Sequence, residues 1–538
     1  MPSYGLFRKV SLIGVLTTLS RVLGVIRDSV CAAYFGAGMV WDAFSFAFRV
    51  PNLFRKLFGE GALRAAFIPV LSDYQSNKDW QEARRLAGTV FCGLGLVLLA
   101  LLLLGESFVL LAPYFTAFSV RWRLTLGLTA IILPYMLFVC MTAFVASVLH
   151  TLKHFAAPAL APVVMNICWI AAVLIFAPLV SPEPTGQILV VAWGIVLAGV
   201  LQLVLQLGVL RKLGFKWIFG LRFRHPGLRK IAASMLPMLA GLAAFQLNVL
   251  LDGVIAITLS APEGAESFRA LGMNIRYPMT VGANSVLYYG SRLMQFPLGV
   301  FGIALATALF PRLSDRAAEE DWEGFRGSFS QALAGVIFIG IPAAVGLAVV
   351  GPPVIDLLFE RGAFTAEMGR RTASVLLAYC GGVWAFCGYH VLTRSYYSAD
   401  YMATPAKMAG GAVVINLLLN LTLIWWWGEA GLAAATSVTF ISQAGILYLT
   451  LPSHLRLRDH SLLGSTLWKS VLATVLMTAV TFGVLRLLPP APAADRVGLK
   501  VLRVGAPVAA GAIAYLGTAA LLRARLLWTI GEQLWSRE

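Results

Sequence analysis

The sequence is poor in charged residues. Only 12% of its 538 residues are Asp, Glu, Lys or Arg, whereas 59% are hydrophobic. A water-soluble domain carries roughly 25% charged residues, so this chain has too little charge to cover a surface that faces water. Its six cysteines show no C-x-x-C spacing and lie mostly in apolar stretches. These shortages exclude a cytosolic enzyme, a secreted disulfide scaffold and a disordered chain.

Several motifs of ATP-driven transport and of hydrolytic enzymes are also missing. No Gly-Lys dipeptide occurs, which excludes a phosphate-binding P-loop and an ATP-driven pump. Neither H-E-x-x-H nor G-x-S-x-G is present. His150 and His154 have a metal-compatible spacing, but they adjoin Lys153 at the end of an apolar run, which favours a headgroup-facing role. We therefore expect no enzyme, no cofactor and no metal site.

Long apolar runs are abundant, and a helix of about 20 residues crosses the roughly 30 Å hydrocarbon core. Fourteen spans are predicted, centred on 10–34, 40–58, 86–112, 124–149, 158–180, 187–210, 231–260, 284–311, 328–350, 372–394, 408–427, 430–452, 465–487 and 501–522. An even number of spans puts both termini on one side of the membrane. The loops on that side are richer in Lys and Arg than the loops on the other side, which makes it the cytoplasmic side. The net charge of +17 then indicates contact with anionic lipid headgroups rather than nucleic acid.

The sequence contains a weak internal repeat. Residues 69–73 (Pro-Val-Leu-Ser-Asp) recur as 311–315 (Pro-Arg-Leu-Ser-Asp), and residues 155–159 (Phe-Ala-Ala-Pro-Ala) resemble 402–406 (Met-Ala-Thr-Pro-Ala). Both pairs have nearly the same offset, which favours a duplication of six spans. We expect an all-α membrane protein with two pseudo-symmetric six-helix lobes around a central cavity and two further helices. The predicted divisions are 1–228, 229–454 and 455–538. Repeat-built transporters bind substrate between their halves, near the bilayer midplane.

Charged residues inside the spans point to a binding site. Five arginines occupy span interiors: Arg21, Arg27, Arg49, Arg55 and Arg292. A polar stripe follows one face of the second span at helical spacing: Asp42, Ser45, Arg49, Asn52 and Lys56. Each central charge costs about 2.5–3.5 kcal/mol, so five facing lipid would cost on the order of 15 kcal/mol. A shared hydrated cavity is therefore expected, and its planar guanidinium groups suit phosphate or carboxylate.

Some of these charges have a second interpretation. Lys56 and Arg64 lie near a span end, where snorkelling to the headgroups is an equally good explanation. Ion pairs inside the protein are the other structural role, and the nearby acids are Asp28, Asp42 and Glu60.

Several segments resemble the MurJ (MviN) family, bacterial lipid II flippases of the multidrug/oligosaccharidyl-lipid/polysaccharide exporter superfamily. The specific segments are 20–28 (S-R-V-L-G-V-I-R-D), 35–39 (F-G-A-G-M), 42–44 (D-A-F) and 51–62 (P-N-L-F-R-K-L-F-G-E-G-A). Residues 66–71 (A-F-I-P-V-L) and 292–300 (R-L-M-Q-F-P-L-G-V) extend the match.

The resemblance implies two lobes forming a V around a cavity, and a groove for the polyprenyl tail along spans thirteen and fourteen. Its implied substrate is lipid II, undecaprenyl diphosphate linked to a disaccharide–pentapeptide, in the bacterial cytoplasmic membrane. The implied cavity residues are Arg21, Arg27, Arg55 and Arg292, with Asp42 beside them. Some relatives carry acids where this chain has Ser291 and Gln295, which makes the cavity here more positive. The segment 260–284 is longer than the resemblance leads us to expect.

We therefore expect a flippase that moves lipid II from the inner to the outer leaflet by alternating access. The four cavity arginines would bind the diphosphate, and the neighbouring polar side chains would orient them or bind sugar hydroxyls: Ser20, Asp42, Arg49 and Asn52. Membrane lipids, and cell-wall synthases as a further possibility, are the expected partners. A weaker interpretation assigns a sodium site to Asp252, Asn416, Asn420 and Thr436, although hydrogen bonds between helices explain such residues better.

Three alternatives stay open. A related exporter would carry another polyprenyl-linked glycan, or a small molecule coupled to a cation; acids rather than arginines would suit a cationic drug. An enzyme acting on polyprenyl phosphates would need clustered acids for Mg²⁺, which the sequence does not provide. A scaffold for cell-wall synthases would not require five arginines within its spans.

Overall fold

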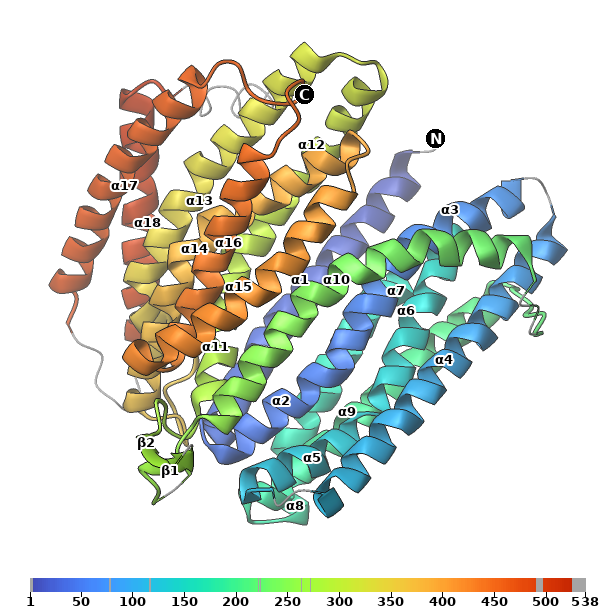
Figure 1. The fold of residues 1–538 in the computed structure, drawn as a ribbon, viewed down its shortest axis with the longest axis horizontal. Coiled ribbons are helices and arrows are strands. Elements are labelled where there is room, and N and C mark those ends of the chain that lie inside the picture. The colour runs from blue at the N-terminus through green and yellow to red at the C-terminus, as the bar shows by residue number, and fades with distance from the viewer. Residues whose placement is uncertain are drawn as a thin grey trace. The chain divides into compact units, whose positions relative to one another are not determined.

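The computed structural model describes residues 3–524 apart from 77–78, 116–117, 221, 223, 263, 271 and 490–496. The chain is mostly helical, with its elements coloured in chain order in Figure 1. Its contacts divide it into two compact units, Met1–Thr258 (unit 1) and Leu259–Glu538 (unit 2). The boundary at 228/229 that the sequence predicts separates functional lobes rather than compact units, and it stays a prediction.

Unit 1 consists of helices, two of which continue into short π-helical segments labelled η. The elements in order are α1 (Ser3–Phe35), α2 (Met39–Phe54), η1 (Arg55–Gly61), α3 (Ala62–Ser76), α4 (Trp80–Phe115), α5 (Val120–Ile132), α6 (Tyr135–Thr151), α7 (Ala156–Ala171), η2 (Ala172–Phe176), α8 (Ala177–Val180), α9 (Pro184–Lys212) and α10 (Pro226–Thr258).

Unit 2 begins with a small antiparallel hairpin and is otherwise helical. Its elements are β1 (Ser267–Ala270), β2 (Met273–Arg276), α11 (Ala283–Pro297), η3 (Leu298–Gly302), α12 (Ile303–Ala318), α13 (Trp322–Leu358), α14 (Ala366–Ser398), α15 (Ala403–Trp427), α16 (Glu429–Leu449), α17 (Ser461–Leu487) and α18 (Val497–Leu521).

Local chemistry explains where several of these helices begin. The side chains of Ser119, Asp321 and Thr365 accept hydrogen bonds from backbone N–H groups in the first turns of α5, α13 and α14. At the start of α17, the exposed Asp459 carboxylate accepts from the backbone N–H and hydroxyl of Ser461, at 2.8 and 2.7 Å. The hydrogen bond from that N–H lowers the pKa of Asp459.

Ten helical stretches in the described part of the chain are long and apolar enough to cross a membrane. The chain is therefore a multi-pass membrane protein. The ten are Trp80–Phe115, Val120–Thr151, Ala156–Val180, Pro184–Lys212, Trp322–Leu358, Ala366–Ser398, Ala403–Trp427, Glu429–Leu449, Ser461–Leu487 and Val497–Leu521. The other four predicted spans also lie on helical segments: α1, α2 with η1, α10, and α11 with η3 and α12. They are the first two spans of each predicted repeat.

Both repeated motifs occupy matching structural positions. Residues 69–73 lie in α3 and residues 311–315 in α12, and each of these helices directly follows a π segment. The other motif marks helix starts: Phe155 is the N-cap residue of α7, and Met402 is that of α15. Matching helix breaks and starts in the two halves are the expected result of duplication.

The long segment 260–284 forms the hairpin and is attached to unit 2. Ser267 pairs with Arg276, and Phe268 pairs with Ile275. The Arg371 guanidinium of α14 holds the end of the segment: Nη1 donates to the Val281 carbonyl at 2.9 Å, and Nε donates to Glu429 Oε1 at 2.6 Å. The extra residues thus make a separate β element rather than lengthening a helix.

The last two helices pack mainly on α13, beside it in Figure 1. The Tyr515 hydroxyl of α18 donates to the Phe338 carbonyl of α13 at 2.5 Å. On the outer faces of α17 and α18, several large apolar side chains are exposed, among them Val475, Phe482 and Ile513. Such faces suit contact with lipid.

Candidate functional site

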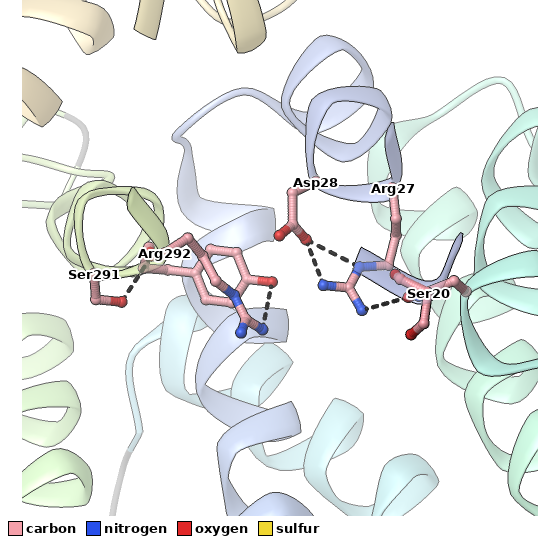
Figure 2. A network of polar contacts seen from close by, with 7 residues as sticks. Ser20, Arg27, Asp28, Ser291 and Arg292 are labelled. Atoms are coloured by element: carbon pink, nitrogen blue, oxygen red, sulfur yellow. Dashed lines mark hydrogen bonds and ion pairs between the residues drawn. The ribbon is translucent and has the colours of Figure 1, made fainter. Parts of the chain in front are cut away.

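Arg27 is the best-defined of the candidate residues. Its Nε and Nη2 donate to Oδ1 of Asp28 at 2.9 and 2.7 Å, as Figure 2 shows. Only 11% of each of these two side chains is exposed. The carboxylate therefore balances the guanidinium charge inside the protein, which lowers the cost of keeping a cation at this depth.

Asn166 of α7 connects Arg27 to the preceding turns of α1. Its Oδ1 accepts from Arg27 Nη1 at 3.0 Å, and its Nδ2 donates to the Ser20 carbonyl at 2.9 Å. One amide thus fixes the guanidinium relative to the α1 backbone. Asn166, which contacts the Arg27 side chain and the Ser20 backbone, is a residue that sequence analysis missed. A signal existed, because Asn166 lies in an otherwise strongly apolar span.

An aromatic wall supports the other side of Arg27. The Trp169 ring lies 4.5 Å from the guanidinium carbon, and only 1% of this residue is exposed. Phe44 and Phe48 of α2 meet Trp169 edge-on, at centroid distances of 5.5 and 4.8 Å. Cation–π attraction and close packing therefore limit the orientations open to Arg27.

The burial of the polar stripe on α2 decreases along the helix. Asp42 and Ser45 are buried, whereas Arg49 and Asn52 are half-buried. Gly253 of α10 permits the close approach of Arg49, because a Cβ atom there would lie 2.9 Å from Arg49 Nη1. The stripe thus lies partly against other helices of unit 1.

Asn52 and Arg55 form a second small cluster in unit 1. Arg55 is the first residue of η1, and its Nε donates to Asn52 Oδ1 at 3.0 Å. Asn52 Nδ2 in turn donates to the Phe48 carbonyl at 3.0 Å. π-helical segments often occur at functional sites, because the extra residue reorients side chains.

The remaining candidates have different surroundings. Arg21 is exposed on α1. In unit 2, Arg292 Nη2 donates to the Tyr288 hydroxyl at 3.2 Å, and Ser291 Oγ donates to the Tyr288 carbonyl at 2.8 Å (Figure 2). Tyr288 is a second residue that sequence analysis missed. The side chain of Glu60 lies outside the described residues.

Among the residues proposed for sodium, Asn416 of α15 is hydrogen-bonded both within its own helix and to a neighbouring helix. In unit 2, Asn420 Nδ2 donates to Asn416 Oδ1 at 3.0 Å, and Asn416 Nδ2 donates to Thr439 Oγ1 of α16 at 3.4 Å. Thr436 instead donates to the carbonyl of Leu432 in its own helix, and Asp252 belongs to unit 1. A sodium site at these residues stays a prediction.

His150 packs against a neighbouring ring at the end of α6. Its imidazole stacks on Phe155 at 5.2 Å. Among the residues that the structure describes, no group of three His, Cys, Asp or Glu is arranged to hold a metal ion.

Comparison with known proteins identifies the family. The family model for the lipid II flippase MurJ matches residues 31–491, which is most of the chain. The chain belongs to this family. A probable lipid II flippase MurJ from Vibrio cholerae is 34% identical over 453 residues, covering 81% of each chain. A lipid II flippase MurJ from Burkholderia cenocepacia is 30% identical and covers 83% of this chain and 84% of its own.

Solved structures give the same fold. A lipid II flippase MurJ in an inward closed conformation matches with a TM-score of 0.73 at 24% identity, covering 96% of this chain and 99% of that one. An inward-facing MATE-family multidrug transporter matches with a TM-score of 0.65 at 13% identity, covering 82% of this chain and 97% of its own. The family resemblance predicted from the motifs of the first 75 residues is thus confirmed. MurJ proteins are named as flippases, a class of transporter rather than of enzyme.

Proposed function

We propose that this chain flips lipid II from the inner to the outer leaflet of the bacterial cytoplasmic membrane, with both termini in the cytoplasm. Membership of the MurJ family over residues 31–491 carries this proposal. In it, residues 1–228 and 229–454 are the lobes of an alternating-access transporter with a central cavity. Residues 455–538 hold the two helices along which the polyprenyl tail stays in lipid.

The placement of the charged residues supports the cavity. Four predicted spans begin the two repeats: α1, α2 with η1, α10, and α11 with η3 and α12. The candidate arginines belong to three of these four segments. Because lipid cannot satisfy such side chains, these helices need a face turned to protein or water.

In the proposed mechanism, the diphosphate binds to Arg21, Arg27, Arg55 and Arg292. Arg27 holds the Asp28 carboxylate when no substrate is bound, so the diphosphate takes over a guanidinium already oriented by Asn166 and Trp169. Ser20, Asp42, Arg49 and Asn52 orient these groups or bind sugar hydroxyls. Bidentate guanidinium–phosphate pairs supply both strength and direction.

In this mechanism, the charges of the substrate and of the arginines drive the transport cycle. The bound anion neutralises the arginines, which lets the lobes close inside and open outside. Moving one charge through the membrane potential is worth about 2.3 kcal/mol per 100 mV. An anion leaving a negative interior moves downhill, and the emptied cationic site is then drawn back inward.

The decisive experiment is depletion of this protein in its host cells. Lipid II should accumulate in the inner leaflet, where an added periplasmic enzyme cannot cleave it, and re-expression of the chain should restore cleavage. Accumulation of a different polyprenyl-diphosphate glycan would instead support a related exporter. Unchanged distributions of both lipids would contradict the proposal.

Replacing Asn166 by leucine should lower the flipping rate about tenfold. The change removes both hydrogen bonds of the amide, and a hydrogen bond to a charged group contributes about 1.5 kcal/mol, close to a factor of ten. The rate is measured in proteoliposomes that contain equal amounts of inserted protein. Ile167→Leu is the control, because Ile167 is the next residue of α7 and is 53% exposed. An unchanged rate in Asn166→Leu would show that the amide does not position Arg27.

A further inference from the structure

A histidine and an arginine of unit 2 are not among the candidate site residues. His390 and Arg394 are one turn apart on the membrane-spanning helix α14, and both are half-buried. They lie eight and four residues before Ser398, where the helix ends. At 1.5 Å per residue, their backbones are about 12 and 6 Å from that end.

Aromatic rings surround this pair. The Arg394 guanidinium carbon lies 5.6 Å from the ring centroid of Phe310 in α12. The His390 ring lies 5.0 Å from Phe386, and Phe386 lies 4.0 Å from Phe440 of α16. Helices α12, α14 and α16 thus all place aromatic side chains around or beside His390 and Arg394.

Arg394 lies at the end of its predicted span, 372–394, and its aromatic neighbour Phe310 lies at the end of the predicted span 284–311. A guanidinium at the end of a span can reach the level of the lipid headgroups. Phe310 thus places the Arg394 guanidinium where a lipid phosphate could meet it.

No carboxylate compensates these two residues. Within the described part of the chain, neither side chain has a hydrogen bond or an ion pair to another residue. Elsewhere in unit 2, Arg371 pairs with Glu429 at 2.6 Å, and Lys500 pairs with Asp356 at 2.6 Å. A cation kept in a membrane helix without a protein partner is costly, which indicates a partner outside the protein.

We propose that His390 and Arg394 form a second anion-binding site, which takes the phosphate group of an amphiphile whose chain lies against the aromatic side chains. Arginine offers a planar fork of donors to phosphate, and an imidazole N–H adds one more. Two lipids share this chemistry: an anionic phospholipid of the bilayer and the lipid-linked diphosphate. The second source rests on the proposed function, whereas the first does not.

The test uses the full-length protein in nanodiscs of phosphatidylcholine, titrated separately with phosphatidylglycerol and with lipid II, with binding read by native mass spectrometry. Arg394→Gln should weaken the binding of one of these lipids at least about tenfold, and His390→Gln about threefold. The matched control is Arg486→Gln. Arg486 lies 4.8 Å from the Phe482 ring at the end of α17, but it is exposed, so its loss should change neither affinity.

Loss of phosphatidylglycerol binding alone would assign the site to bulk phospholipid, and loss of lipid II binding alone would assign it to the substrate. Unchanged binding of both lipids by Arg394→Gln would overturn the proposal. Arg394→Lys keeps the charge and should retain at least half the affinity, which separates a binding defect from misfolding. If Arg394→Gln does not fold, His390→Gln decides in the same way. Wild-type protein that binds phosphatidylglycerol but does not flip lipid II would refute the proposed function alone.

Discussion

Replacing Arg27 by alanine is expected to lower the rate of lipid II flipping at least about a hundredfold. The guanidinium is held by Asp28, Asn166 and Trp169 in one orientation, so its charge and its geometry are lost together. Losing a charge-assisted bidentate contact to phosphate costs about 3 kcal/mol, which corresponds to that factor. The rate is measured in proteoliposomes, and rescue of depleted cells provides a second readout.

The control for this experiment is Arg211→Ala, which removes an exposed cation at the end of α9. It should retain wild-type flipping and show that net charge alone does not explain the loss. The same loss is expected when alanine replaces Arg21, Arg55 or Arg292. Retained flipping in all four alanine variants would refute a mechanism in which these arginines bind the diphosphate.

Replacing Trp169 by alanine is expected to lower the free energy of unfolding by about 3–5 kcal/mol. Trp169 is 1% exposed, and it joins Phe44 and Phe48 to the side of α7 that faces Arg27. The truncation leaves a cavity between α2 and α7 and removes the aromatic face beneath the guanidinium. Thermal unfolding in detergent gives the measurement, and Trp169→Phe should recover most of the loss.

Trp193→Ala is the matched control, because Trp193 is 60% exposed on α9 of the same unit. Its change in stability should stay within about 0.5 kcal/mol, as for other surface substitutions. Equal destabilisation by the two alanine variants would mean that the aromatic wall has no special role in the packing of unit 1.

Much of the architecture was predictable because its causes are local. Runs of apolar residues determine where helices cross a membrane, and side chains such as Ser119 and Thr365 determine where helices begin. The repeated motif at 69–73 and 311–315 predicted equivalent positions in the two halves of the chain. Both segments do lie in a helix that directly follows a π segment. Ten stretches of the described residues are long and apolar enough to cross a membrane, and the count of fourteen spans stays a prediction.

By itself, the sequence determined that this is a multi-pass helical membrane protein of the MurJ family, and it singled out the arginines of its first two spans. Only the tertiary structure decided which groups surround those arginines. Arg27 contacts Asn166, 139 residues away in the chain, because α1 packs on α7. Arg394 likewise meets Phe310 because α14 packs on α12. The partners of a buried guanidinium depend on which helices pack together, and that packing involves residues far apart in sequence.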